Sequence, residues 1–264
     1  MSVTLLVSAL NADVDELIAK MNIASDAVIV NQCGENGRRE ITGDHRMLVI
    51  SSADKGVGVS RNLCIANAFG DISLFSDDDI VYDAGYAEMV AWEFNSHPEA
   101  DLITFNVDVC EERRTYHNDV FKKLNGFNIG RYPAYSIAVR TDVLKNKALS
   151  FSPLFGGGAK YSNGEDSLFL KEALKKGVRM YASPIKIARE EPRPSTWFEG
   201  YTEKFFFDRG VLFAFLYGKA AFIWRIRFLL TKKEMFTGKI TRGEAGKLIR
   251  SGIREGRRIK KENV

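Results

Sequence analysis

The chain has 264 residues, of which 45% are hydrophobic and 27% charged, with a formal net charge of +4, and these values are ordinary for a globular protein. Its length suits one large α/β domain, or one such domain with an appendage. No stretch reaches the roughly 18 uncharged apolar residues of a membrane-spanning helix, since Lys219, Arg225 and Arg227 interrupt the most apolar segment, and this argues against an integral membrane protein.

The first 110 residues alternate between short apolar runs and amphipathic segments, which predicts a β-α-β rhythm. Strands are expected at 3–9, 26–33, 47–52, 71–76 and 101–107, and helices at 13–21, 56–70 and 85–96. This rhythm implies an α/β fold with a mostly parallel, Rossmann-like sheet and helices on both of its faces. Because such sheets bind ligands beyond the carboxyl ends of their strands, residues that follow a strand are the first candidates for a site.

The second half of the chain is less regular. Between 111 and 164 the pattern loosens, and it ends in the Gly-rich loop FGGGAKYSNG. An amphipathic helix is then expected at 165–177 and a strand at 178–185. Pro192 and Pro194 break regular structure there. The rest of the chain is predicted to be helical and aromatic-rich, with a helix at 203–218 that packs on the main domain.

Three consecutive aspartates, Asp77, Asp78 and Asp79, directly follow the strand expected at 71–76. Adjacent carboxylates repel one another, and each one costs free energy to desolvate. A divalent cation such as Mg²⁺ or Mn²⁺ prefers oxygen ligands and keeps water and phosphate oxygens in its shell. The aspartates are therefore candidates for a partial metal site that a diphosphate would complete, with a simple polar turn as the alternative.

The stretch KGVGVSRN, at 55–62, precedes and opens the next expected helix. Gly56 allows close approach of the backbone, and a helix N-terminus offers N–H groups to an anion. Lys55 and Arg61 add positive charge, so this stretch is a candidate phosphate-binding element. In the alternative interpretation the glycines only shape a turn and Arg61 pairs with an aspartate. The stretch matches neither the Walker A pattern nor the dinucleotide-binding fingerprint.

The stretch GEDSLFL, at 164–170, places Glu165 and Asp166 at the start of a helix. Acidic residues favour the first turn of any helix, which is a sufficient structural explanation for many such pairs. The Gly-rich loop just upstream can shape a cleft, however. A carboxylate in that position can take a proton from a hydroxyl group as a general base.

In this order the three stretches resemble the family 2 glycosyltransferases, which have a GT-A fold. The resemblance covers roughly residues 3–190 and is carried by KGVGVSRNLCIANAFGDISLFSDDDIVY and by GEDSLFLKEALKKGVRMYASP. It implies that Asp77, Asp78 and Asp79 bind a divalent metal, Mn²⁺ or Mg²⁺, and the diphosphate of a nucleotide-sugar donor. It also implies that Asp166, with Glu165 beside it, activates the acceptor hydroxyl, and that the anomeric centre is inverted in a single displacement.

Two positions depart from the pattern of the family. Its second strand usually ends in aspartates that contact the nucleoside, whereas here it ends in Asn31 and Gln32, which can still bind a base or ribose by hydrogen bonds. The usual aspartate register would also place Ser76 at the first acidic position, so Asp78 and Asp79 are the safer metal ligands. The remaining donor contacts are expected from Lys55, Gly56 and Arg61.

The resemblance implies a GT-A catalytic domain at 1–195, with donor binding at about 1–110 and the acceptor side at about 111–195, followed by a helical basic extension at 196–264. We expect an inverting, hexosyltransferase-like enzyme that uses a UDP-sugar in surface or capsular polysaccharide synthesis. One alternative is a sugar nucleotidyltransferase, although SALNADVDE after the first strand lacks the Gly-rich basic loop of that class. The other is a non-catalytic scaffold on the same fold.

Charge is unevenly distributed along the chain. Residues 219–264 contain 14 Lys and Arg against 4 Asp and Glu, whereas residues 1–218 contain 24 against 30. A basic tail beside aromatic and apolar residues predicts contact with a membrane surface or an acidic partner, while a merely solvated helix is the alternative. Contact with a membrane would fit a lipid-linked saccharide acceptor. Nucleic acid is not an expected partner.

The cysteines and the N-terminus indicate the cellular compartment of the protein. Cys33, Cys64 and Cys110 are far apart and lack zinc-binding spacing, so they are expected to be reduced thiols. No signal peptide is visible at the N-terminus. We therefore expect a cytoplasmic protein, with peripheral association at the inner face of the membrane as a further expectation from the basic tail.

Overall fold

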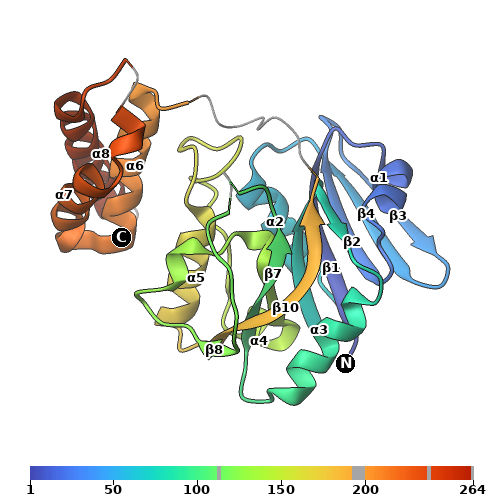
Figure 1. Cartoon of the computed structure of the whole chain (residues 1–264). Helices are drawn as coiled ribbons and strands as arrows, with labels where there is room; N and C mark the ends of the chain where they lie inside the picture. Colours follow the sequence, from blue (N-terminus) through green and yellow to red (C-terminus); the bar gives the residue numbers. More distant parts are fainter. Residues whose placement is uncertain (112–113, 192–199, 237–238, 263–264) are drawn as a thin grey trace.

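A computed structural model of the chain describes residues 1–111, 114–191, 200–236 and 239–262 (Figure 1). Its strands are β1 (Val3–Leu10), β2 (Asp26–Gln32), β3 (Gly37–Thr42), β4 (Arg46–Ser52), β5 (Ile72–Asp77), β6 (Ile80–Tyr82), β7 (Leu102–Asp108), β8 (Lys122–Lys123), β9 (Ile137–Arg140) and β10 (Met180–Glu190). Its α-helices are α1 (Val14–Lys20), α2 (Val57–Asn67), α3 (Tyr86–Ser96), α4 (Thr141–Asn146), α5 (Glu165–Lys175), α6 (Glu203–Tyr217), α7 (Ala221–Thr231) and α8 (Arg242–Glu262).

Within the described residues, one sheet has the order β3-β4-β2-β1-β5-β9-β7-β10-β6, and β8 pairs with β10. Strands β4, β2, β1 and β5 run parallel to one another, as do β7 and β10. The mostly parallel sheet predicted from the sequence is therefore confirmed. Because parallel strands end at the same edge, the segments after β1, β2, β4 and β5 come together there.

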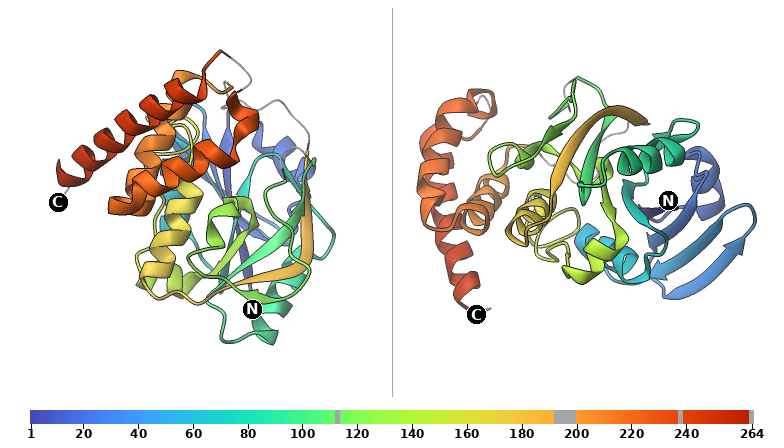
Figure 2. Two further views of the ribbon diagram at one scale, coloured as in Figure 1. Left: turned by 60° about the vertical axis from the view of Figure 1, so that its left-hand side comes forward. Right: turned by 90° about the horizontal axis from the view of Figure 1, so that it is seen from below.

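The core lies on both faces of this sheet, in two clusters under the helices that Figure 2 shows on either side of it. Successive side chains of a strand point to opposite faces, so Leu5 and Val7 of β1 join a cluster with α1 and α3, whereas Leu6 joins one with α2, α4 and α5. The central strands β1, β5 and β7 are buried almost throughout because both faces are covered, and their polar residues, such as Thr4 and Ser73, are buried with the apolar ones. The helices expected on both faces are confirmed.

Of the strands in the described residues, four were not predicted: β3, β6, β8 and β9. Strand β3 reads GRREIT and is exposed except at the half-buried Ile41, so it has no apolar pattern, and its charged side chains suit an edge of the sheet. Strand β9 is only four residues long and pairs antiparallel with both β5 and β7. It lies in the region predicted to be irregular. The predicted boundary at 195, with Pro192, Pro194 and Trp197, lies outside the described residues, so the domain division stays a prediction.

The C-terminal helices α6, α7 and α8 form a separate unit beside α5 (Figure 1). The expected helical C-terminal extension is thus confirmed. Helix α6 also packs on the main domain, because its Val211, Leu212 and Leu216 share a cluster with Phe155 and Tyr161 of the Gly-rich loop. Within the described residues, no helix is both long and apolar enough to span a bilayer.

Close contact between α6 and α8 depends on glycine. A Cβ atom at Gly252 would overlap the carbonyl oxygen of Phe207 and would lie 2.9 Å from the Val211 nitrogen. We expect Gly252→Ala to lower the free energy of unfolding by about 1–3 kcal/mol, because overpacked backbone must move apart. Urea denaturation measures this change.

Gly243→Ala is the matched control on the same helix, because nothing lies within 4 Å of the Cβ it would add. There, alanine should raise the free energy of unfolding by roughly 0.4–1 kcal/mol through its better helix propensity. Equal effects of the two substitutions would contradict the glycine-dependent packing of α6 on α8.

Candidate functional site

Arg61 of α2 lies at the centre of the predicted site. Its guanidinium is 2.7 Å from Asp77 Oδ1 at the end of β5, 3.1 Å from Glu165 Oε1 and 3.0 Å from Asp166 Oδ1 at the start of α5. The Arg61 side chain is only 4% exposed. One buried cation therefore joins the stretches at 55–62, 77–79 and 164–170, which the sequence analysis singled out separately.

The ion pairs determine the charge state of this cluster. Burial alone would lower the pKa of Arg61, but the nearby carboxylates of Asp77, Asp166 and Glu165 outweigh it and raise that pKa, so Arg61 stays charged. Burial, and then the adjacent Glu165, raises the pKa of Asp166 well above its ordinary value, against the opposing effect of Arg61. Three carboxylates thus share one guanidinium, and Asp166 holds its proton more tightly than an ordinary aspartate does.

Helix α2 reaches this position because it packs closely on the segment before the Gly-rich loop. A Cβ atom at Gly58 would lie 2.6 Å from the carbonyl oxygen of Ser152, so only glycine allows this approach. The Asn62 amide donates to the Phe151 carbonyl at 2.8 Å and accepts from its N–H at 2.7 Å. The Phe151 ring also lies 5.2 Å from the Arg61 guanidinium carbon, in a cation–π contact.

The Gly-rich loop lies directly against the N-terminus of α2. The Val57 N–H donates to the Gly157 carbonyl at 2.9 Å, so this first N–H of the helix is already engaged. Gly156 has a φ of +105°, and a Cβ atom there would lie 2.8 Å from the Glu165 carboxyl carbon. The loop therefore lets Glu165 approach α2, while Lys55 stays exposed beside it.

The aspartates at 77–79 do not form a cluster of three converging ligands. Asp77 is directed to Arg61, whereas Asp78 Oδ2 accepts from the Leu10 N–H at 3.0 Å and so ties the turn to the end of β1. Among the described residues, no group of three His, Cys, Asp or Glu side chains is arranged to hold a metal ion. Carboxylates at this strand end fit a partial site that phosphate oxygens complete, and not a site made by the protein alone.

Asn31 and Gln32 brace the loops at the edge of the sheet where donor binding was predicted. The Asn31 amide accepts from the Ala12 N–H at 3.1 Å and donates to the Ala12 carbonyl at 2.8 Å, which closes the loop after β1. Gln32 Oε1 accepts from the Gly56 N–H at 2.8 Å and so fixes the start of α2. A direct contact of either residue with a nucleoside stays a prediction.

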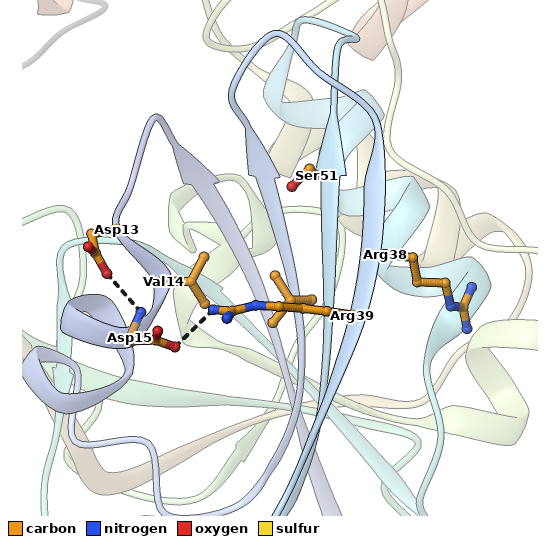
Figure 3. A pocket seen from close by; sticks show the side chains of 7 residues that line it. Asp13, Val14, Asp15, Arg38, Arg39 and Ser51 are labelled. Carbon is orange, nitrogen blue, oxygen red and sulfur yellow. Dashed lines mark hydrogen bonds and ion pairs between the residues drawn. The ribbon is translucent and has the colours of Figure 1, made fainter.

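A pocket that the sequence did not predict lies between α1 and strands β3 and β4 (Figure 3). Its volume is about 380 Å³, and it is lined by Asp13, Val14, Asp15, Arg38, Arg39, Val49 and Ser51. The Arg39 guanidinium contacts Asp15 Oδ1 at 2.8 Å across it. Since Asp13 directly follows the loop that Asn31 closes, the pocket borders the same edge of the sheet. The paired arginines of β3 were its only visible signal in the sequence.

The sequence of the chain matches the model of a known protein family. The sequence model described as "Glycosyl transferase family 2" matches residues 14–154, just over half of the chain. Among curated proteins, none matches the chain.

Solved structures resemble the whole fold. Residues 1–349 of TarS from S. aureus, in complex with UDP-GlcNAc, match with a TM-score of 0.58 and 14% identity, over 96% of this chain and 72% of that one. The mannosyltransferase PcManGT from Pyrobaculum calidifontis, in complex with GDP-Man and Mn²⁺, matches with a TM-score of 0.52 and 13% identity, over 96% and 74%. At these identities the likeness concerns the fold, and it confirms the expected GT-A type.

Proposed function

Because the chain belongs to glycosyl transferase family 2, we propose that it moves a sugar from a nucleoside-diphosphate sugar, expected to be a UDP-sugar, to a saccharide hydroxyl with inversion. The observation that carries this proposal is the buried contact of Arg61 with Asp77, Glu165 and Asp166. It holds the proposed donor side, at the end of β5, next to the proposed acceptor side, at the start of α5. UDP-GlcNAc in TarS and GDP-Man in PcManGT support such a donor.

Asp166 is the proposed general base. Its side chain is 25% exposed, compared with 11% for Glu165, so it is the more accessible of the two for an acceptor hydroxyl. Its raised pKa makes it a better proton acceptor than an ordinary aspartate once it is ionised. Glu165, held by Arg61 and by the Gly-rich loop, is proposed to position the start of α5.

The donor diphosphate is proposed to bind at residues 77–79 together with Mn²⁺ or Mg²⁺. Asp78 and Asp79 are the proposed ligands on the metal side, as the aspartate register of the family implies, while Asp77 pairs with Arg61. Bound there, the ion would stabilise the negative charge of the departing diphosphate. Lys55 and Gly56 are proposed to approach the phosphates, and Asn31 and Gln32 to shape the nucleoside side.

The acceptor is proposed to be a saccharide, including one linked to a lipid, in the synthesis of a capsule or another surface polysaccharide. The basic charge of residues 219–264 supports an acceptor at a membrane surface. This part of the proposal extends the family assignment, which names neither the donor sugar nor the acceptor.

Calorimetric titration with UDP, GDP, CDP and dTDP, each with and without Mn²⁺, tests the donor site. We expect one nucleotide to bind, to bind more tightly with Mn²⁺, and to bind at least about tenfold more weakly to Asp79→Asn, because a charged ligand is lost. Asp44→Asn, at an exposed position between β3 and β4, is the matched control and should bind like the wild type. Absence of binding by every nucleotide would instead favour a non-catalytic scaffold.

A further inference from the structure

Helix α7 exposes a stripe of large apolar side chains. The exposed fractions are 54% for Phe222, 55% for Ile223, 48% for Ile226 and 57% for Leu230. Phe222, Ile226 and Leu230 are four residues apart, so they follow one face of the helix, with Ile223 beside them. Single exposed apolar residues are ordinary, but a contiguous group of them on one helix marks an interaction surface.

The opposite face of α7 is held in place by packing. Ala221 is fully buried, and Trp224, Phe228 and Leu229 pack in a cluster with side chains of α6 and α8. The Arg225 guanidinium also donates to the Gly246 carbonyl of α8 at 3.3 Å. These contacts define the rotation of the helix about its axis. The apolar stripe therefore points outward as a fixed feature of the unit.

Positive charge surrounds the stripe. Lys219 precedes α7 by two residues, Lys232 and Lys233 follow it directly, and Arg227 is exposed on the helix itself. Between 218 and 236 the only acidic residue is Glu234, which contacts Lys232 at 3.7 Å. Helix α8, which packs beside α7, adds exposed basic side chains such as Arg250. An apolar strip with a basic rim is complementary to a surface with a negatively charged outer layer and an apolar layer beneath it.

We propose that the α7 stripe docks on the surface of an anionic lipid bilayer, with Phe222, Ile223, Ile226 and Leu230 entering the boundary between headgroups and acyl chains. Helices that lie in this boundary have an apolar face and a Lys/Arg-rich polar side. A second copy of the chain is the less suitable occupant. A twofold contact through this stripe would bring two rims of the same sign together, and like charges at an interface are costly.

Docking through α7 would fix the orientation of the proposed active site. Helix α6 packs on α7 and also on the start of α5. The second contact is so close that a Cβ atom at Gly164, directly before Glu165, would overlap the Leu212 side chain of α6. The Ser162 N–H also donates to the buried Asp208 carboxylate of α6 at 2.9 Å. The inference itself rests on α7 and does not depend on the proposed sugar transfer.

Sedimentation of the full chain with lipid vesicles tests this inference. The vesicles contain phosphatidylcholine mixed with phosphatidylglycerol, or phosphatidylcholine alone. We expect binding to the mixed vesicles that weakens in high salt, and much weaker binding to phosphatidylcholine alone. Phe222→Ser should reduce binding roughly tenfold, since one large apolar side chain no longer enters the bilayer. Ile226→Glu should reduce it further, because a negative charge would face anionic lipid.

Trp92→Ser is the matched control, because Trp92 is 60% exposed on α3 of the main domain, and its binding should equal that of the wild type. Equal binding by Phe222→Ser and wild type, or no binding of the wild type to mixed vesicles, would overturn the inference. A dimer in light scattering that Phe222→Ser dissociates would overturn it in favour of a second copy. Nucleotide titrations of the same variants separate the two proposals, because donor binding should be unchanged in all of them.

Discussion

Replacing Arg61 with alanine is expected to lower the free energy of unfolding by about 3–5 kcal/mol, the cost of removing one partner from a buried ion pair. Arg61 is 4% exposed and contacts Asp77, Glu165 and Asp166. Without it, three carboxylates would face one another in a poorly solvated place. Sugar transfer should also be lost, because β5 and α5 would no longer be held together. Urea denaturation and transfer assays measure the two effects.

Two further variants make this result specific. Arg46→Ala removes an exposed arginine that pairs with Glu40, and should cost less than about 1 kcal/mol, as is usual for surface pairs. Arg61→Lys keeps the positive charge but loses the planar fork that contacts several carboxylates at once. It should therefore be more stable than Arg61→Ala and still defective in transfer. A decrease of under 1 kcal/mol in the free energy of unfolding of Arg61→Ala would show that the ion pairs of Arg61 contribute little to stability.

Asp166→Asn is expected to lower the rate of sugar transfer by about 10²–10⁴-fold, which is the usual contribution of a general base. Asparagine has nearly the same shape but cannot accept the proton. Nucleotide binding should be unchanged, so the loss would appear in turnover and not in donor affinity. Glu172→Gln, on the same helix and paired with Lys176, is the matched control and should transfer sugar normally. Full activity of Asp166→Asn would exclude Asp166 as the base.

The raised pKa of Asp166 also predicts how activity and stability depend on pH. Transfer should fall at acidic pH, with a midpoint above the roughly 3.9 of an ordinary aspartate, because the base must be ionised. The contribution of Asp166 to the free energy of unfolding depends on pH in the opposite direction from activity. The folded protein binds this proton more tightly than the unfolded chain, so its contribution is complete below the unfolded pKa and is lost as pH rises through the folded pKa. Asp166→Asn should abolish this part of the pH dependence of urea denaturation.

Several features of this protein follow from local sequence alone. All three α-helices and five of the seven strands in the first 110 residues were predicted closely, because apolar periodicity and glycine stops are properties of neighbouring residues. The helix α5 and the start of β10 were predicted for the same reason. The short, charged strand β3 and the four-residue strand β9 carry no such pattern. Strand β9 pairs with β5 and β7, which are distant in the chain, whereas β3 pairs with the neighbouring β4 through mostly charged, exposed residues. Propensity therefore revealed neither strand.

The candidate site was likewise predicted in part from the sequence and determined in part only by the fold. The sequence placed Asp77, Asp78 and Asp79 at a strand end and Asp166 at a helix start, and the ordered motifs pointed to the family. It left open whether Arg61 binds phosphate or pairs with an aspartate, and the fold shows that it pairs with three carboxylates, two of which lie more than 100 residues away.

Only the tertiary structure decided which groups face one another. It engages the amide of Asn31 with the loop after β1, and it leaves Phe222 and Ile226 of α7 facing solvent. The reason is physical: periodicity records whether a side chain can be buried, whereas its partner is determined by the packing of whole elements. Long-range ion pairs and outward-facing stripes are therefore properties of the fold, and no local pattern in the sequence specifies them.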